Sequence, residues 1–168
     1  MELSQQYAPL GYGQLTASGT AALLSTAVQA SFTASAVGNQ LTTTSVAGVI
    51  RIGSNLNGTG APAGTTIINQ VSGPLGGAGV YTTSVVTTMS SASATTTGIP
   101  AGANLAIISV ATANIMWRDD GGAPTTTVGM PIVAAAAPFA YSGNINQFSL
   151  IAVSGSPIVN VAFYRSVG

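Results

Sequence analysis

Short runs rich in Val, Ile, Thr, Tyr and Phe recur along this chain, separated about every 8–12 residues by glycine, proline, serine or threonine. The alternation is clearest from Ile158 to Arg165, where Val159, Val161 and Phe163 are each followed by a less hydrophobic residue. A period of two gives a strand one buried face and one mixed face. The pattern therefore predicts an all-β fold, either a sandwich or a barrel.

Three further strands are predicted in the C-terminal half, at Gln147 to Val153, Leu105 to Val110 and Asn114 to Arg118. A short turn-type linker separates the first of these from the strand at Ile158 to Arg165, and another separates the other two from each other. Such linkers favour hairpins. The sequence therefore predicts a meander of antiparallel strands in this half.

The segment from about Ser31 to Ala92 has a different composition, which is nearly uncharged and dominated by Gly, Thr, Ser and Val. Its candidate strands are Phe32–Ala36, Gln40–Val46, Val49–Leu56, Thr65–Val71 and Gly79–Val86. Glycine-rich loops between them predict tight turns. We expect a separate small β module here.

Only one segment, Gly19 to Ala34, carries enough alanine and leucine to suggest a helix. The β-favouring residues Thr20, Thr26 and Val28 oppose that interpretation. We expect at most a short helix.

Charged residues are scarce. The chain has three arginines and three acidic residues, no lysine and no histidine, so its net charge is zero. Three scattered arginines cannot supply the phosphate contacts that drive nucleic-acid binding, nor attraction to anionic membranes. Soluble monomers ordinarily carry a charged surface that opposes association. The composition therefore favours a chain that assembles with copies of itself or with a partner, over a weakly charged monomer coated with Thr, Ser and Asn.

The chain is expected to be a soluble protein. Its most apolar stretch, Val128 to Tyr141, is interrupted by Pro131 and Pro138 and is too short to span a bilayer. The first residues do not resemble a secretory signal, because no basic segment precedes an apolar one. The chain contains no cysteine, which excludes disulfides and thiolate sites.

The segment Trp117-Arg118-Asp119-Asp120-Gly121 concentrates charge and is the first candidate for an active site. General acid–base catalysis near neutral pH ordinarily uses histidine, cysteine or lysine, and none is present. Adjacent carboxylates on an extended strand point to opposite faces, whereas a glycosidase pair must converge on one bond. We therefore expect no enzyme activity, no catalytic residue, no cofactor and no metal site.

The same segment fits a polar turn. Aspartate caps backbone N–H groups, and Gly121 and Gly122 accept left-handed backbone angles. Arg118 is expected to pair with one of the aspartates or with a subunit contact, and Trp117 to pack in the core, with an interface hot spot as the alternative. Asp119→Ala or Gly121→Val is predicted to impair folding or assembly.

Three stretches carry a resemblance: "YAPLGYGQLT" (Tyr7–Thr16), "IPAGANLAIISVATANIMWRDDGGAPTTTVGMPI" (Ile99–Ile132) and "INQFSLIAVSGSPIVNVAFYR" (Ile145–Arg165). They resemble a group of small tailed-bacteriophage virion proteins whose core reads IPxGA…WRDDG…PT…VGMP. The middle of the chain, Ser31–Ser84, is similar to a Gly/Thr-rich β unit of phage fibre and virion surface proteins.

The resemblance implies an antiparallel β-sandwich, jelly-roll-like, formed by residues 1–30 and 94–168, with a small β module inserted at 31–93. It implies a virion structural protein, either on the head or in the tail and its fibres. Because few charges would have to be desolvated on association, we expect a capsid decoration or cement protein that stabilises the head as a homo-oligomer, expected to be a trimer. The partners would then be copies of itself and the major capsid protein or another virion protein. The protein would be made in the host bacterial cytoplasm and reside in the virion.

Met1 to Gly13 is a candidate docking arm, with Tyr7, Pro9, Leu10 and Tyr12 as contacts, or alternatively an edge strand. The alternative function is a tail-fibre or surface adhesin module that binds host glycans, in which tyrosines would stack on sugars. The tyrosines considered are Tyr12, Tyr81, Tyr141 and Tyr164. A carboxylate-dependent hydrolase is the least favoured alternative.

Overall fold

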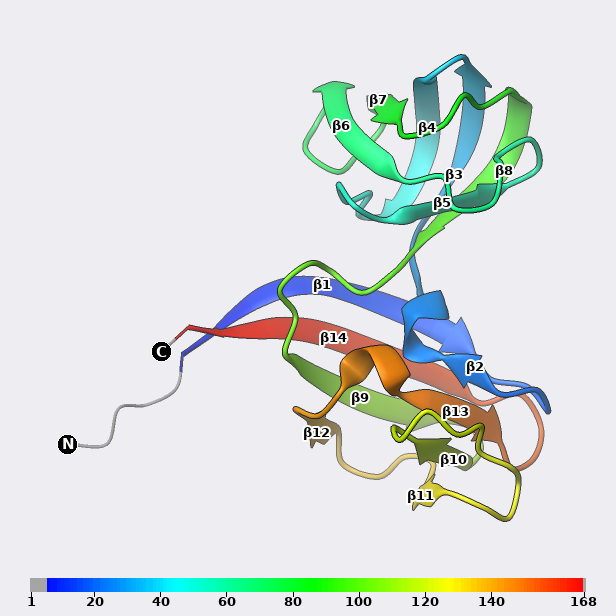
Figure 1. The fold of residues 1–168 in the computed structure, drawn as a ribbon, viewed down its shortest axis with the longest axis vertical. Helices are drawn as coiled ribbons and strands as arrows, with labels where there is room; N and C mark the ends of the chain where they lie inside the picture. The colour runs from blue at the N-terminus through cyan, green and yellow to red at the C-terminus, as the bar shows by residue number, and fades with distance from the viewer. Residues whose placement is uncertain (1–5, 168) are drawn as a thin grey trace. The chain divides into compact units, whose positions relative to one another are not determined.

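The computed structural model describes residues 6–167, and these form strands with only two short 3-10 turns (Figure 1). The chain divides into two compact units, one made of the chain up to Ala27 and from Ile99 onward, the other of Val28–Gly98. The second unit is thus inserted in the first, with boundaries at 27/28 and 98/99 where 30/31 and 93/94 were predicted. None of the described residues forms a helix long and apolar enough to cross a membrane.

The first unit is a sandwich of two four-stranded antiparallel sheets. One sheet has the order β12-β9-β14-β1 and the other β11-β10-β13-β2. The bounds are β1 (Gln6–Thr16), β2 (Ala22–Leu23), β9 (Leu105–Ala111), β10 (Ile115–Arg118), β11 (Met130–Ile132), β12 (Phe139–Tyr141), β13 (Ser149–Ala152) and β14 (Ile158–Val167), with 3-10 turns η1 (Leu24–Thr26) and η2 (Ile145–Gln147).

The strand pairing in this unit is nested. The first strand pairs with the last, β1 with β14; the second with the seventh, β2 with β13. The third pairs with the sixth, β9 with β12, and the fourth with the fifth, β10 with β11. This is one long hairpin wrapped into two facing sheets, the arrangement of an eight-stranded jelly roll. The prediction of an antiparallel, jelly-roll-like β-sandwich is confirmed.

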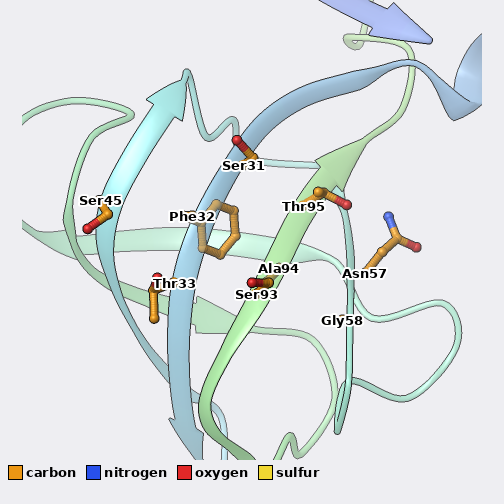
Figure 2. A pocket seen from close by; sticks show the side chains of 9 residues that line it. All are labelled: Ser31, Phe32, Thr33, Ser45, Asn57, Gly58, Ser93, Ala94 and Thr95. Carbon is orange, nitrogen blue, oxygen red and sulfur yellow. The ribbon is translucent and has the colours of Figure 1, made fainter. Parts of the chain in front are cut away.

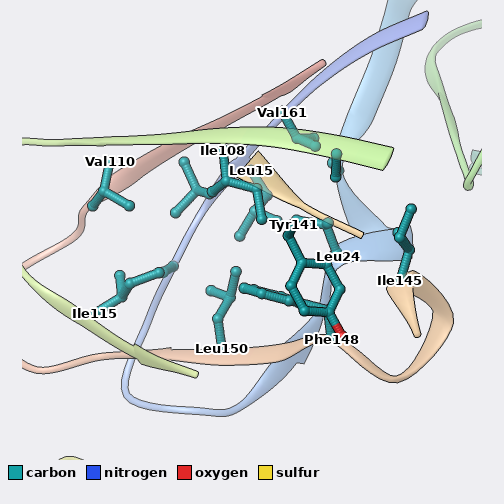
Figure 3. Packing of buried hydrophobic residues seen from close by; sticks show 14 of the residues in the cluster. Leu15, Leu24, Ile108, Val110, Ile115, Tyr141, Ile145, Phe148, Leu150 and Val161 are labelled. Carbon is teal, nitrogen blue, oxygen red and sulfur yellow. The ribbon is translucent and has the colours of Figure 1, made fainter. Parts of the chain in front are cut away.

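The core between the two sheets follows from the alternation in the sequence. Val159, Val161 and Phe163 of β14 are fully buried, as the period of two predicts. Ile115 and Leu150 reach the same core from the facing sheet (Figure 3). Large aliphatic and aromatic side chains thus fill the space between two thin layers.

The two hairpins predicted in the C-terminal half are wrong. β9 and β10 follow each other in the chain but belong to different sheets, and so do β13 and β14. Each linker carries the chain from one sheet to the facing one, so that Val110 and Ile115, on either side of a linker, are both buried in the shared core. A short turn has the same composition whether it joins paired strands or crosses a sandwich.

The inserted unit consists of six antiparallel strands in the order β5-β8-β3-β4-β7-β6. Their bounds are β3 (Val28–Val37), β4 (Gln40–Gly48), β5 (Asn55–Gly58), β6 (Ile67–Ser72), β7 (Gly79–Thr83) and β8 (Met89–Thr97). The end strands meet through a bridge between Asn55 and Thr66. Backbone hydrogen bonds from Leu56 N–H to Thr65 and from Ile67 N–H to Ser54 flank this bridge, so the sheet closes into a small barrel.

Small side chains make this barrel narrow. Ala30, Phe32, Ala34 and Ala36 of β3 alternate into its core, where Tyr81 of β7 is the largest fully buried side chain. Such a thin interior agrees with the low aromatic content of 6%.

The remaining strand predictions hold in part. The predicted strand Val49–Leu56 begins only at Asn55, because residues 49–54 form a loop. β8 was missed, since its run of Ser, Ala and Thr has no hydrophobic signal. The predicted helix is the single 3-10 turn Leu24–Thr26, after which β3 begins at Val28.

Candidate functional site

The charged turn follows β10 in the jelly-roll unit. In β10, Trp117 is paired with Met130 of the edge strand β11 on one side and with Leu150 of β13 on the other. Arg118 is the last residue of the strand, as predicted. The chain then loops through Asp119 to Gly129 before it returns as β11.

Arg118 and Asp120 form a bidentate ion pair. The Nε and Nη2 groups of Arg118 donate to the two carboxylate oxygens of Asp120 at 3.0 and 2.5 Å. One of those oxygens also accepts the backbone N–H of Gly122 at 3.1 Å. These bonds, first the one from Arg118 and then the one from Gly122, lower the pKa of Asp120 to about 2. The same pairing raises the pKa of Arg118.

Asp119 has a different partner. The hydroxyl of Tyr141, in β12, donates to its Oδ2 atom at 2.6 Å. Tyr141 is only 6% exposed. Burial and then the hydrogen bond to Asp119 raise the pKa of the tyrosine hydroxyl above its ordinary value.

The predicted polar turn is therefore present, with its roles divided between the two aspartates. Asp120, not Asp119, accepts the backbone N–H of the turn. Gly121 has a φ of +84°, whereas Gly122 does not have a left-handed backbone. An aspartate with a pKa of about 2 is a poor general acid near neutral pH. The two carboxylates bind separate partners, since Asp120 binds Arg118 whereas Asp119 accepts the hydroxyl of Tyr141.

Trp117 lies in a group of four aromatic side chains. Its ring is stacked on Phe148 with centroids 4.6 Å apart and an interplanar angle of 8°. Tyr141 meets both rings edge-on, at 5.5 Å from Trp117 and 5.0 Å from Phe148, and Phe139 lies 5.7 Å from Trp117. Trp117 thus packs on the jelly-roll core, as predicted, while remaining half-buried.

The returning part of the loop is held by threonine and glycine. The hydroxyl of Thr125 accepts the backbone N–H groups of Thr127 and Val128 at 3.3 and 3.0 Å. Gly129 has a φ of +143° and lies against the backbone of Trp117. A shallow hollow of about 280 Å³ remains here, lined by Trp117, Arg118, Asp119, Asp120, Val128, Gly129 and Met130.

The candidate docking residues Tyr7, Pro9, Leu10 and Tyr12 lie in β1. This strand is paired with β14 from Gln6 opposite Val167 to Thr16 opposite Ile158, with a register shift between Pro9 and Gly11. The structure thus places the four residues in a strand of the sandwich and not in a separate arm. The first five residues of the proposed arm lie outside the described residues.

The tyrosines considered for sugar stacking do not share one surface role. Tyr81 and Tyr141 are buried, so that part of the prediction is wrong. Tyr12 is 51% exposed and donates its hydroxyl to Asn160, and Tyr164 is half-buried. Tyr81 and Tyr141 pack in the hydrophobic cores, and the sequence alone did not distinguish them from surface tyrosines.

Sequence reasoning missed the contribution of β12 and β13 to this site. Tyr141 and Phe139 come from β12, and Phe148 directly precedes β13. The available signal was three aromatic residues within ten positions in a chain that is poor in them. Within residues 6–167, no three His, Cys, Asp or Glu side chains lie close enough together to hold a metal ion.

Comparison of the chain with protein-family models, with curated proteins and with solved structures finds no match in any of the three. The function is therefore inferred from the sequence, the surface and the geometry of the chain itself.

Proposed function

We propose that this chain is a structural protein of the bacteriophage virion, a capsid decoration protein that stabilises the head as a homo-oligomer, most simply a trimer. Its resemblance to small phage virion proteins supports the virion assignment. The observation that carries the proposal is the surface of the two β units, which is poor in charge and rich in exposed hydrophobic side chains.

Exposed large hydrophobic residues greatly outnumber charged ones in the described chain. Of the five charged residues there, Arg118 and Asp120 neutralise each other and Asp119 is bound by Tyr141. The exposed large hydrophobic side chains are Tyr7, Tyr12, Leu23, Val37, Val49, Ile52, Ile68, Val71, Leu75, Val85, Val86, Val128, Met130, Val133 and Val167. Such a surface favours burial against other subunits, because little charge has to be desolvated.

One sheet of the jelly roll shows this property along its outer face. The register places Tyr12, Ala162, Ile107 and Ala140 in one row across β1, β14, β9 and β12. The next row contains Gln14, Asn160 and Ser109, which are polar and uncharged. These side chains are exposed or half-buried. Two copies of a face without charge can pack together without leaving a buried ion unpaired.

The oligomeric state tests the proposal directly. Light scattering after size exclusion, at micromolar concentration, is expected to give a discrete oligomer. Ala140→Glu places a charge in the exposed row and is expected to weaken the oligomer. The matched control is Ala101→Glu, at an exposed alanine outside the strands.

The location of the protein in the phage particle is the second part of the test. Mass spectrometry and cryo-electron microscopy of purified phage particles are expected to find the chain on the head in stoichiometric amounts. A monomer at micromolar concentration that is also absent from purified particles would overturn the proposal.

A further inference from the structure

The inserted barrel has a surface hollow of about 440 Å³ that the proposed structural role does not use. It lies over β3, β5 and β8, with one residue from β4 at its rim (Figure 2). Its lining is almost entirely hydroxyl and amide side chains and small residues: Ser31, Phe32, Thr33, Ser45, Asn57, Gly58, Ser93, Ala94 and Thr95. Its volume lies within the range of small-molecule sites.

The strand register arranges the polar side chains of the hollow in two rows. Ser31, Thr95 and Asn57 face one another across β3, β8 and β5. Two positions along, Thr33 faces Ser93. Side chains two residues apart on a strand are about 7 Å apart, and neighbouring strands are about 5 Å apart. The five groups therefore span an area of about 7 by 10 Å. This is the scale of one monosaccharide with its hydroxyl groups.

The residues between the two rows form the floor of the hollow and place no side chain in it. Ala94 and Phe32 point into the barrel core, and Phe32 is only 5% exposed. Gly58 lies beside Ala94 with no side chain. Ser45 flanks this floor at a β-bulge of β4, where it has a left-handed φ of +52°.

The hydroxyl groups in the hollow have no internal partners. None of Ser31, Thr33, Ser45, Ser93 and Thr95 makes a side-chain hydrogen bond with another residue of the described chain. Elsewhere in this barrel the fully buried hydroxyls of Thr65, Thr83 and Thr87 bond within it, and that of Thr96 has no partner. Asn57 is positioned by a bond from its amide nitrogen to Thr97, which leaves its side-chain carbonyl as an acceptor.

The absence of charged side chains from the lining of the hollow indicates which class of ligand it can bind. Arg51 is the only charged residue between Val28 and Gly98, and it does not line the hollow. A phosphate, sulfate or carboxylate would find no cation here to compensate for its desolvation. A purely apolar ligand would leave the hydroxyl and amide groups of the wall without hydrogen bonds to it and would find almost no exposed aromatic surface.

We propose that this hollow binds a neutral saccharide unit. Hydroxyl groups that both donate and accept match the hydroxyls of a sugar ring, since each can adopt the complementary role by rotation. Recognition by side-chain hydroxyls without a large aromatic platform predicts weak binding, with a millimolar Kd.

Many copies of the chain on one particle would bind a surface that carries many saccharides more tightly than one copy does. If the chain decorates a particle as proposed above, a repeated millimolar site gains affinity through multivalency. Only this gain rests on the proposed function. Binding of one sugar by the purified full chain is independent of it, so the two proposals fail in separate experiments.

The test is a titration of amide chemical shifts in the ¹⁵N-labelled full chain. The probes are the methyl glycosides of D-glucose, D-galactose and D-mannose, and N-acetyl-D-glucosamine, each up to roughly 100 mM, well above a millimolar Kd. At least one is expected to give saturable shifts centred on Ser31, Thr33, Asn57 and Thr95. Glucose 6-phosphate and N-acetylneuraminic acid, which are anionic, are expected to bind at least tenfold more weakly.

Paired variants separate this site from non-specific sugar contact. Thr33→Val with Thr95→Val removes two hydroxyls at nearly constant volume and is expected to weaken binding at least tenfold. Thr42→Val with Thr82→Val, on β4 and β7 outside the hollow, is expected to leave it unchanged. The spectrum of each variant reports whether the barrel is intact. Absence of saturable shifts with every neutral probe, equal binding by the Thr33/Thr95 variant, or tighter binding of an anionic sugar would each overturn the proposal.

Discussion

The hydroxyl of Tyr141 donates a hydrogen bond of 2.6 Å to the carboxylate of Asp119. Tyr141 ends β12 in one sheet of the jelly roll, and Asp119 directly follows β10 in the other sheet. This bond therefore links the two sheets at the edge where Trp117 stacks on Phe148. The charged turn is part of the closure of the sandwich.

Removal of this bond is expected to destabilise the jelly-roll unit. Tyr141→Phe keeps the buried ring and deletes the hydroxyl, so the free energy of unfolding should fall by about 1–2 kcal/mol. Urea unfolding followed by tryptophan fluorescence measures this, because Trp117 lies beside the tyrosine. Tyr12→Phe removes an exposed hydroxyl bonded to Asn160 and should cost less. An equal loss in the two variants would contradict the role assigned to Asp119.

The protein is expected to lose stability in alkaline solution. Burial raises the pKa of Tyr81, and burial together with Asp119 raises the pKa of Tyr141. A tyrosine of the unfolded chain titrates at about 10. The folded state therefore holds these protons more tightly, so their contribution is complete below about pH 10 and is lost as the pH rises further. Urea midpoints measured from about pH 8 to 11 should fall at the upper end. Tyr141→Phe should reduce that slope, and an unchanged slope would oppose this account.

Asp120 gives the opposite pH dependence. Its pKa of about 2 lies below that of an unfolded aspartate, about 3.9. The stabilising effect is therefore present above about pH 4 and is lost as the pH falls towards 2. Arg118→Gln removes the main cause and should move the pKa of Asp120 upward, as a carboxyl ¹³C titration would show. Arg165→Gln is the control and should leave it in place. A value near 3.9 in the unmodified protein would contradict the ion pair.

Two glycines of the charged loop should differ in their tolerance of a side chain. Gly121 has a left-handed backbone, and a Cβ there would make only an ordinary contact, 3.7 Å from Oε1 of Gln147, so Gly121→Ala is expected to cost about 1–2 kcal/mol. In Gly129→Ala the new Cβ would lie 2.9 Å from the carbonyl oxygen of Trp117, in addition to the unfavourable φ. Its cost should be larger by about 1 kcal/mol or more. Urea unfolding of both variants ranks them, and a smaller loss for Gly129→Ala would refute the close approach.

The sequence predicted what depends on local pattern. The alternation of Val159, Val161 and Phe163 specified a strand and its buried face, and the Asp-Asp-Gly-Gly stretch specified a turn. The division into a sandwich and a small β module followed from composition and from the resemblance.

Pairing depends on long-range packing, and there the sequence was insufficient. The linker between Ala152 and Ile158 has the composition of a hairpin turn, yet it carries the chain between sheets because Leu150 and Val159 fill one core from opposite sides. The partner of Asp119 was equally hidden, since Tyr141 lies twenty-two positions away and reaches it only when β12 and β10 close the same edge. The saccharide hollow combines side chains of four strands, and only their register brings them together.

The two ends of the inserted barrel lie side by side. Val28 is paired with Thr97 across β3 and β8, and the buried side-chain amide of Gln29 donates to the carbonyl of Gly98 at 2.6 Å. The hydroxyl of Ser54 donates to the other end of that amide at 2.7 Å. The two ends of the barrel are therefore neighbours within the barrel itself, as a tolerated insertion requires.

Deletion of the barrel should leave a folded jelly roll. Paired residues of antiparallel strands lie about 5 Å apart, so a linker of two or three glycine and serine residues can replace Val28–Gly98. The jelly-roll core from Leu15 to Phe163 draws no residue from the deleted unit. The shortened chain is expected to keep a cooperative urea transition and the fluorescence of stacked Trp117, and to lose the saccharide-induced shifts. Phe148→Ala in the shortened chain is the control and should abolish the transition, because it removes a fully buried ring. A shortened chain without a cooperative transition would show that the jelly roll depends on the barrel for its stability.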